Sequence, residues 1–397
     1  MKSLENVARE QEGYVVELRR ALHSHPETRY ETKDTRRRIL DEIDAAITGN
    51  QGNTVIREPR ESKGGIVVDI DVDRDRDRVL FRADFDALPV PETTGLPCAS
   101  RREGISHACG HDAHTAMLLG FLRCISEGSI APAHNIRLVF QDAEENPGMP
   151  PEPVSGGDLL VQEGVLDGIS AAYALHIWTG EEAHHGMFLS RPGALLGNSG
   201  RVRFLFATSG GHAGRPHMGV NALRVAHAAM SRLDMFAARF FSPAEPIALE
   251  PVILNAGTGS NVIPARAELW YGFRTLLPRD RHVAMMEKCI AEVRAVAESM
   301  EAEFEATPLY GHPALINDPA VFDRVAALLR EYGQEVKESP PMLGGEDFAH
   351  YLYGVPGAMF TLEAYTPGSG RQHTPLFNPD ETVFWKGVLF WAILATR

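Results

Sequence analysis

The sequence predicts an α/β protein in which one α/β domain carries an inserted, smaller domain. In the first half of the chain, apolar strands alternate with helices, which is typical of a largely parallel sheet. Between residues 200 and 308 the predicted order changes to βαββαβ, the signature of a ferredoxin-like domain. After Pro313 the first pattern resumes. We therefore expect one domain over residues 1–192 and 313–397, interrupted by a second over residues 193–312.

The spacing of apolar residues predicts the elements of the first domain. Residues 5–22 and 32–47 carry apolar side chains at helical intervals among charged ones. The charged residues 71–77 separate two apolar strands, and we expect them to form the solvated tip of a hairpin. The expected helices are 5–22, 32–47, 114–127, 158–163, 320–332 and 382–395, and the expected strands are 65–70, 78–84, 135–140, 171–177 and 357–362.

The same reasoning predicts the elements of the inserted domain. Small residues at 198–200 and 210–211 stand where the chain enters it, which is compatible with a hinge. The expected strands are 200–208, 251–255, 265–275 and 302–308, and the expected helices are 221–238 and 281–298.

Composition and charge argue against several classes of protein. The 397 residues are 44% hydrophobic and 23% charged, as in ordinary globular proteins, which excludes wholesale disorder. The formal net charge of −14 repels phosphate backbones and argues against nucleic acid as a partner. We find no apolar stretch of about 18 residues and no signal-peptide core, so we expect no membrane partner and a cytoplasmic location. Four cysteines do not make a disulfide scaffold.

Carboxylates follow two of the predicted strands. Asp84 and Asp86 stand at the end of the strand 78–84, and Glu144 and Glu145 follow the strand 135–140. Sites in α/β proteins collect at such strand ends. Each pair taken alone is better explained as turn residues or as a solvated acidic loop. In a loop, however, one carboxylate can bind a metal while its neighbour stays free as a general base.

Residues 107–114 concentrate thiol, imidazole and carboxylate groups. Cys109 and His111 flank a glycine just before a predicted helix, whose N-terminus favours a thiolate. Thiolate and imidazole both suit borderline metals such as Zn²⁺, Mn²⁺, Co²⁺ and Ni²⁺. A buried structural cysteine explains Cys109 by itself, but four ligand-capable side chains within six residues favour a metal site.

Two further histidines extend this set of ligand types. His176 lies inside an apolar strand and His373 in a loop rich in Gly and Pro, and neither is informative alone. Together the five ligand-type residues, spread over four elements, are Cys109, His111, Glu145, His176 and His373. Five protein ligands are too many for one catalytic metal with an open position, but they fit two metals sharing a water. Glu144 is then available to take the proton of that water and pass it to a leaving nitrogen.

Short motifs throughout the chain carry a resemblance to a known family. They are HSHPET (23–28), RADFDALP (82–89), SHACGHDAHTAMLLG (106–120), FQDAEE (140–145), ALHIW (174–178), GGHAGRPH (210–217), NVIP (261–264), GGEDF (344–348) and HTPLF (373–377). At these motifs the chain resembles the M20 metallopeptidase family, in particular its amidohydrolase branch. The resemblance implies a zinc-peptidase-like α/β domain with an inserted ferredoxin-like lid that commonly dimerises, and hence a homodimer.

The resemblance also implies roles for individual residues. It implies Glu144 as general base, and it implies that Asp86 orients a ligand or tunes the metals. A His ligand of the peptidase branches corresponds to Asp84 here, and Cys109 is expected to compensate for it. The implied ligands of the two divalent metal ions are Cys109, His111, Glu145, His176 and His373.

The lid is expected to contribute to the site as well. His212 resembles a residue that reaches a partner subunit's site and stabilises the developing oxyanion. Asn261 and Arg274 resemble groups that hold the carboxylate of a substrate, for which the planar fork of Arg is suited.

Two departures from the family pattern leave the substrate open. Most relatives have Pro where Asp142 stands, and we expect this carboxylate either to repel acidic substrates or to face solvent. The segment 146–157 is longer and richer in Pro than is usual there, and it is a candidate for reshaping the pocket wall.

The sequence therefore predicts metal-dependent hydrolysis of a C–N amide bond in a small N-acyl or aroyl amino acid or related amine. Alternatives stay open: a dipeptidase or carboxypeptidase of the same family, another small C–N substrate, a non-catalytic metal-binding protein, and a mechanism with Cys109 as nucleophile. The identity of the metal, among Zn, Mn, Co and Ni, also stays open.

Overall fold

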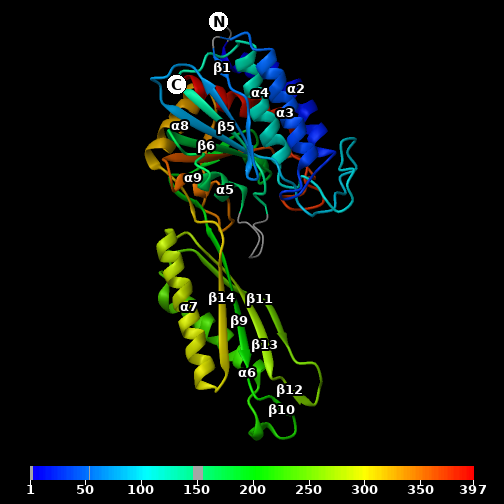
Figure 1. The fold of residues 1–397 in the computed structure, drawn as a ribbon, viewed down its shortest axis with the longest axis vertical. Helices are drawn as coiled ribbons and strands as arrows, with labels where there is room; N and C mark the ends of the chain where they lie inside the picture. The colour runs from blue at the N-terminus through cyan, green and yellow to red at the C-terminus, as the bar shows by residue number, and fades with distance from the viewer. Residues whose placement is uncertain (1–2, 53, 146–154) are drawn as a thin grey trace. The chain divides into compact units, whose positions relative to one another are not determined.

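The computed structural model describes residues 3–52, 54–145 and 155–397, which form two compact units (Figure 1). Unit 1 comprises residues 1–193, 316–340 and 350–397, and unit 2 comprises residues 194–315 and 341–349. The domain boundaries expected from the sequence stay a prediction. Among the described residues, no helix is both long and apolar enough to span a membrane.

Unit 1 is built on a nine-stranded mixed sheet. Its strands are β1 (Val55–Ile56), β2 (Arg60–Ser62), β3 (Gly65–Asp71), β4 (Arg78–Asp84), β5 (Asn135–Gln141), β6 (Ile169–Trp178), β7 (Phe188–Ser190), β16 (Val336–Glu338) and β17 (Gly357–Glu363). The order is β1-β3-β5-β4-β6-β17-β7-β16, with β2 paired to β3. The central strands β5, β4, β6 and β17 are parallel, so their carboxyl ends share one edge of the sheet.

The expected hairpin of β3 and β4 is wrong. β5 lies between these strands, antiparallel to β3 and parallel to β4. All seven residues of β5 are buried, which suits a central position better than an edge. Residues 73–77 are exposed as expected, but they lead past β5, where the Asn135 side chain binds the backbone of Val72, Asp73 and Arg76.

Helices cover the sheet of unit 1. They are α1 (Leu4–Glu10), α2 (Glu12–His23), α3 (Lys33–Thr48), α4 (His111–Ser126), α5 (Gly156–Gln162), α8 (Pro319–Glu331) and α10 (Trp385–Thr396). α4 is central: it packs on β4 and β6 and contacts α2, α3 and α10. The single helix expected over 5–22 is two helices that meet at Gln11. Because Gln11 keeps helical backbone angles, the apolar spacing continues across the break.

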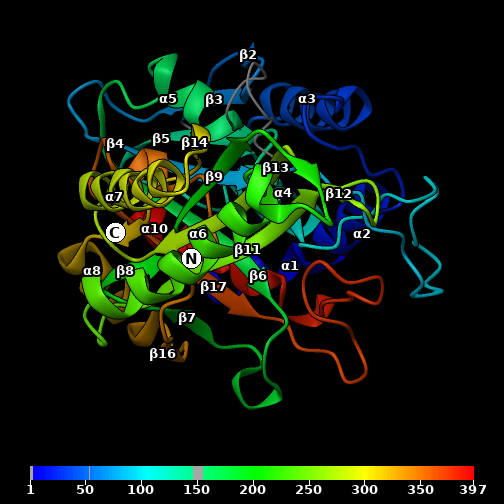
Figure 2. The same ribbon diagram turned by 90° about the horizontal axis from the view of Figure 1, so that it is seen from below.

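Unit 2 has the predicted element order βαββαβ. Its elements are β9 (Asn198–Ala207), α6 (Ala222–Phe240), β11 (Ile247–Ala256), β13 (Arg266–Thr275), α7 (Arg279–Ser299) and β14 (Glu303–Tyr310). The four strands form an antiparallel sheet in the order β11-β13-β9-β14, which leaves β11 at an edge. Helices α6 and α7 lie side by side and pack against this sheet (Figure 2).

The remaining elements are short. β10 (Gly211–His212) pairs with β12 (Val262–Ile263) in unit 2. The others are β8 (Gly193–Leu196), β15 (Leu315–Asn317), α9 (Ala349–Leu352) and the 3₁₀ turns 182–184, 216–218 and 381–383.

Candidate metal centre

The candidate metal centre lies in unit 1, where the parallel strands end. Asp86 follows β4, Glu144 and Glu145 follow β5, His176 is near the end of β6, and the loop after β17 carries His373. The structure brings together all five residues that the sequence singled out as ligand types. Since they span residues 109 to 373, it is the parallel topology of the sheet that makes them neighbours.

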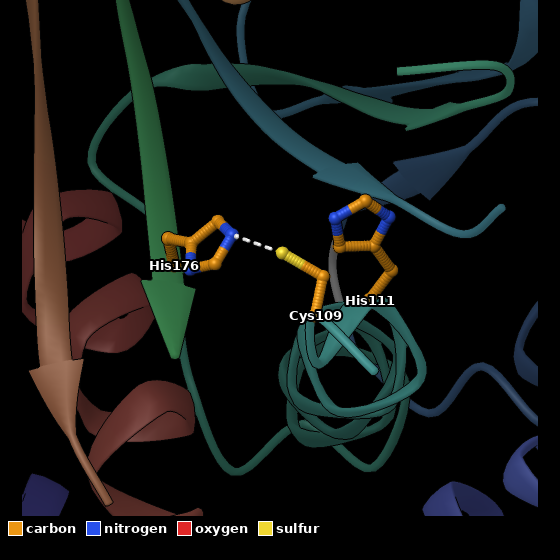
Figure 3. A group of neighbouring side chains, drawn as sticks. All are labelled: Cys109, His111 and His176. Atoms are coloured by element: carbon orange, nitrogen blue, oxygen red, sulfur yellow. Dashed lines mark hydrogen bonds between the residues drawn. The ribbon is translucent and has the colours of Figure 1, made fainter. Parts of the chain in front are cut away.

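Cys109 and His111 are placed by the start of α4. Gly110, the N-cap of this helix, has φ 100°, a left-handed conformation that favours glycine. A Cβ at this position would also lie 3.3 Å from the side chain of Ile177. The turn directs the Cys109 thiol toward β6, where Sγ lies 3.4 Å from His176 Nε2, and Figure 3 shows His111 beside this pair.

Glu145 and His373 complete the group of candidate ligands. The distance from Glu145 Oε1 is 3.2 Å to His373 Nε2 and 3.7 Å to His111 Nε2. His373 has φ 64°, a left-handed conformation that costs about 1–3 kcal/mol in a residue other than glycine. Its backbone N–H donates to the Ala108 carbonyl at 2.7 Å, which ties this loop to the Cys109 segment.

The donor set fits metal ions. The ligand atoms of Cys109, His111 and His176 lie within 4.8 Å of one another, and so do those of Cys109, Glu145 and His373. Both ring nitrogens of His111 and Oε1 of Glu145 are buried and have no hydrogen-bond partner among the described residues. Buried polar atoms are nearly always paired in native proteins, so these atoms are ready to bind a cation.

The charge of the site also favours a cation. Burial alone would lower the pKa of His111, but Asp84, Asp86 and Glu145 raise this pKa to about 10. Burial raises the pKa of the Cys109 thiol well above its usual value, and the carboxylates of Glu145 and Glu144 raise it further. Both groups are therefore protonated, because carboxylates lie close to them. A divalent cation in the same place would replace these protons.

Asp84 and His114 form a buried hydrogen-bonded pair next to the candidate ligands. Asp84 Oδ2 accepts from Arg82 Nη1 and Oδ1 accepts from His114 Nδ1, both at 2.6 Å. His114 Nε2 accepts the Ile177 N–H at 2.7 Å, next to His176. Burial would raise the pKa of Asp84, but Arg82, His111 and His114 hold it well below its usual value. Asp84 and His114 are therefore already engaged within the protein, and sequence reasoning did not foresee this pairing.

Asp86 lies beneath the segment that carries the glutamates. Its Oδ1 accepts the Glu144 N–H at 3.0 Å and its Oδ2 accepts the Glu145 N–H at 3.2 Å. Oδ1 also lies 3.4 Å from His111 Nδ1. Burial raises the pKa of Asp86. This position suits the expected orienting role, which stays a prediction together with the role of Glu144 as base.

Asp142 does not face solvent, so that expectation was wrong. Its side chain is fully buried, and Oδ2 accepts from Thr32 Oγ1 at 2.5 Å and from Arg36 Nη2 at 3.1 Å. Sequence reasoning missed this pairing because Arg36 lies 106 residues away in the chain. Of the Pro-rich segment 146–157, residues 146–154 lie outside the described residues.

The three expected lid residues lie in unit 2. His212 on β10 is paired with Val262, and the Asn261 carbonyl accepts the N–H of Ala213 at 3.0 Å, so His212 and Asn261 are neighbours. Arg274 is on β13, and its Nη1 donates to the Leu343 carbonyl at 3.1 Å. His212, Asn261 and Arg274 are all exposed. Their roles stay predictions.

The fold and this set of thiol, imidazole and carboxylate groups define a metal-dependent hydrolase of C–N amide bonds. The chain belongs to peptidase family M20/M25/M40, which matches residues 80–397. This confirms the resemblance and the fold class predicted from the sequence.

Individual relatives match along nearly the whole chain. Thermostable carboxypeptidase 1 of Saccharolobus solfataricus is 29% identical over 100% of this chain and 98% of that protein. N-acetylcysteine deacetylase of Bacillus subtilis is 29% identical over 96% of each chain. Among solved structures, the Bacillus subtilis YXEP protein, a dinuclear metal-binding peptidase from the M20 family, is 25% identical with a TM-score of 0.81, covering 98% of each chain.

Proposed function

We propose that the protein removes the acyl or aroyl group from a small N-acyl amino acid, using two divalent transition-metal ions. The observation that carries the proposal is the convergence of two overlapping ligand groups in unit 1, with buried donor atoms on His111 and Glu145 that make no hydrogen bond among the described residues. The residues proposed to hold the metals, whether Zn, Mn, Co or Ni, are Cys109, His111, Glu145, His176 and His373. The dinuclear YXEP relative supports two ions per chain.

The chemistry divides between the metals and the side chains around them. When bound, the metal ions polarise the substrate carbonyl and lower the pKa of water. Glu144 accepts the proton of the attacking water and delivers it to the leaving nitrogen. Asp86 holds Glu144 and Glu145 by their backbone amides during these steps. His212 is proposed to donate to the oxyanion in the site of a partner subunit, and Asn261 and Arg274 are proposed to hold the substrate carboxylate.

A carboxypeptidase activity is the second candidate, because a carboxypeptidase is among the relatives. Arg274 suits a free carboxylate in both substrate classes, so it does not separate them. The deacetylase relatives support the N-acyl amino acid instead. A panel of N-acetyl and N-benzoyl amino acids against dipeptides separates the two candidates by kcat/KM. Higher values on the dipeptides would overturn the proposal.

Replacing Arg274 by Ala should raise KM for an N-acyl amino acid about 10- to 100-fold, since hydrogen bonds to a charged group contribute about 1.5–3 kcal/mol. Steady-state kinetics on the free acid and on its methyl ester measure the effect. The ester lacks the carboxylate, so its KM should change little. Arg266→Ala is the control, because Arg266 is an exposed residue on the same strand. Equal losses on acid and ester would refute carboxylate recognition by Arg274.

We further propose that the small-molecule hydrolase is a homodimer joined through unit 2. The edge strand β11 exposes Val252, Ile253 and Leu254, which are 57%, 45% and 42% accessible. An exposed apolar edge strand is a ready surface for pairing with another chain. The exposed apolar side chains and the position of β11 at the edge of the sheet both support a second copy of this chain as the partner.

Replacing Ile253 by Lys should convert the dimer to a monomer, because a charge on the edge opposes strand pairing. Sedimentation velocity at micromolar concentration measures the change. Val55→Lys is a matched control, since Val55 is an apolar residue on β1 of unit 1 that is 55% accessible. A monomeric wild-type protein, or an Ile253→Lys variant that remains dimeric, would contradict this interface.

A further inference from the structure

Two buried aspartates hold the segment that carries Glu144 and Glu145. Asp142 Oδ1 accepts the Ala143 N–H at 2.9 Å, and Asp86 accepts the next two N–H groups. Three consecutive amides are therefore bound by carboxylates. Ala143 itself has φ 50°, which is uncommon for a residue other than glycine. Such a conformation persists only where the surroundings impose it.

Asp142 is in turn fixed from α3. Its Oδ2 accepts from Thr32 Oγ1 at 2.5 Å, from Arg36 Nε at 3.2 Å and from Arg36 Nη2 at 3.1 Å. Arg36 also donates to the carbonyls of Ser62 and Lys63, each at 2.8 Å. One guanidinium thus joins the first turn of α3, the turn before β3 and the end of β5.

Burying the Asp142 carboxylate costs free energy of desolvation, and the benefit that could offset this cost is a fixed local geometry. Asp142 is fully buried and lies in the field of Asp86, a second buried carboxylate. Burial and the Asp86 carboxylate raise the pKa of Asp142 to about 7, although the hydrogen bonds from Thr32 and Arg36 act to lower it. A neutral side chain of similar size would avoid the desolvation of a charge. A fully bonded ionic network, by contrast, specifies one arrangement of the chain.

We propose that Asp142, held by Arg36 and Thr32, is a positioning residue that sets the placement of Glu144 and Glu145 for hydrolysis. This inference rests on the proposed function, in which Glu144 is the base and Glu145 a metal ligand. Asp142 acts through the backbone of residues 143–145 and touches neither substrate nor metal. Displacing a catalytic group by about 1 Å can cost about 100-fold in rate, so a loosened segment should show in kcat.

The test compares Asp142→Asn, Arg36→Gln and the double variant with the wild type. We expect both single variants to lower kcat about tenfold with KM within about twofold, because the base moves while the substrate contacts remain. Metal release to a chelator should become several-fold faster, since Glu145 is on the same segment. The double variant should recover part of the Arg36→Gln loss, because it leaves no unpaired buried charge.

Controls keep this test decisive. Arg37→Gln alters an exposed arginine on the same turn of α3 and should change neither readout. Should Arg36→Gln fail to fold, Thr32→Val removes only the hydroxyl that donates to Asp142 and accepts from Arg36 Nε, and this hydroxyl does not cap α3. If kcat per folded, metal-loaded chain and metal release match the wild type in every variant, Asp142 only stabilises the fold and the proposal is overturned. The release rate is read without substrate, so it also tests the proposal if the wild type proves inactive on amides.

Discussion

Replacing Glu144 by Gln should lower kcat about 10³-fold and leave the metal content of the protein unchanged. Positioned proton transfer contributes about 10²–10⁴-fold to enzymatic rates, and the amide of Gln cannot accept the proton of the attacking water. Asp86 accepts a hydrogen bond from the backbone N–H of Glu144, not from its side chain. Replacing the side chain by that of Gln therefore leaves this hydrogen bond in place. Steady-state kinetics and metal analysis of the same preparation measure both effects.

Glu145→Gln is the matched comparison for Glu144→Gln. The two residues are adjacent, both N–H groups bind Asp86, and both side chains are largely buried, with 8% of the Glu145 side chain exposed. Glu145 Oε1 lies 3.2 Å from His373 Nε2, and Glu145 shares a ligand group with Cys109 and His373, so its substitution should release metal as well as activity. If Glu144→Gln instead lost metal while Glu145→Gln kept it, the two roles would have to be exchanged.

The fold could be predicted from the sequence wherever the signal is local. Apolar periodicity predicted the longer helices and strands of both units, and the order βαββαβ followed from it. It did not predict the short elements, which are β1, β2, β7, β8, β10, β12, β15, β16 and α9. Pairing between strands is not local, so the hairpin of β3 and β4 was predicted wrongly. In the structure every residue of β5 is buried, as suits a strand in the middle of a sheet, but this burial results from the fold and is not written in the sequence of the strand.

The candidate site was predictable in its ligand types and less so in its supports. Cys109, His111 and Glu145 stand out by residue type and by their place at strand ends and at a helix start. The partners of Asp142 and His114 do not, since Arg36 and Ile177 lie on other elements and are ordinary residues for their positions. Contacts of this kind depend on the packing of helices against strands, which periodicity does not encode.

Removing the Cys109 thiol should lower the metal content from about two ions per chain to about one. Cys109 belongs to both of the ligand groups proposed to hold the metals, with His111 and His176 in one and with Glu145 and His373 in the other. In Cys109→Ala each group keeps two protein ligands, fewer than the three that catalytic sites commonly supply, and the weaker group should empty. Elemental analysis of freshly purified protein gives the count.

Cys98→Ser is the control for Cys109→Ala, because Cys98 is a free, partly exposed cysteine that belongs to neither ligand group. Chelation of the wild type should abolish activity, and adding metal back should restore it. A metal content near one in the wild type would mean a mononuclear site. The proposed ligand roles of Glu145 and His373 would then be the first to be rejected, because the His373 side chain is the most exposed of the five at 54%. Full activity in a metal-free wild type, lost on alkylation of Cys109, would instead establish the thiol as the nucleophile, because Cys109 Sγ lies 3.4 Å from His176 Nε2.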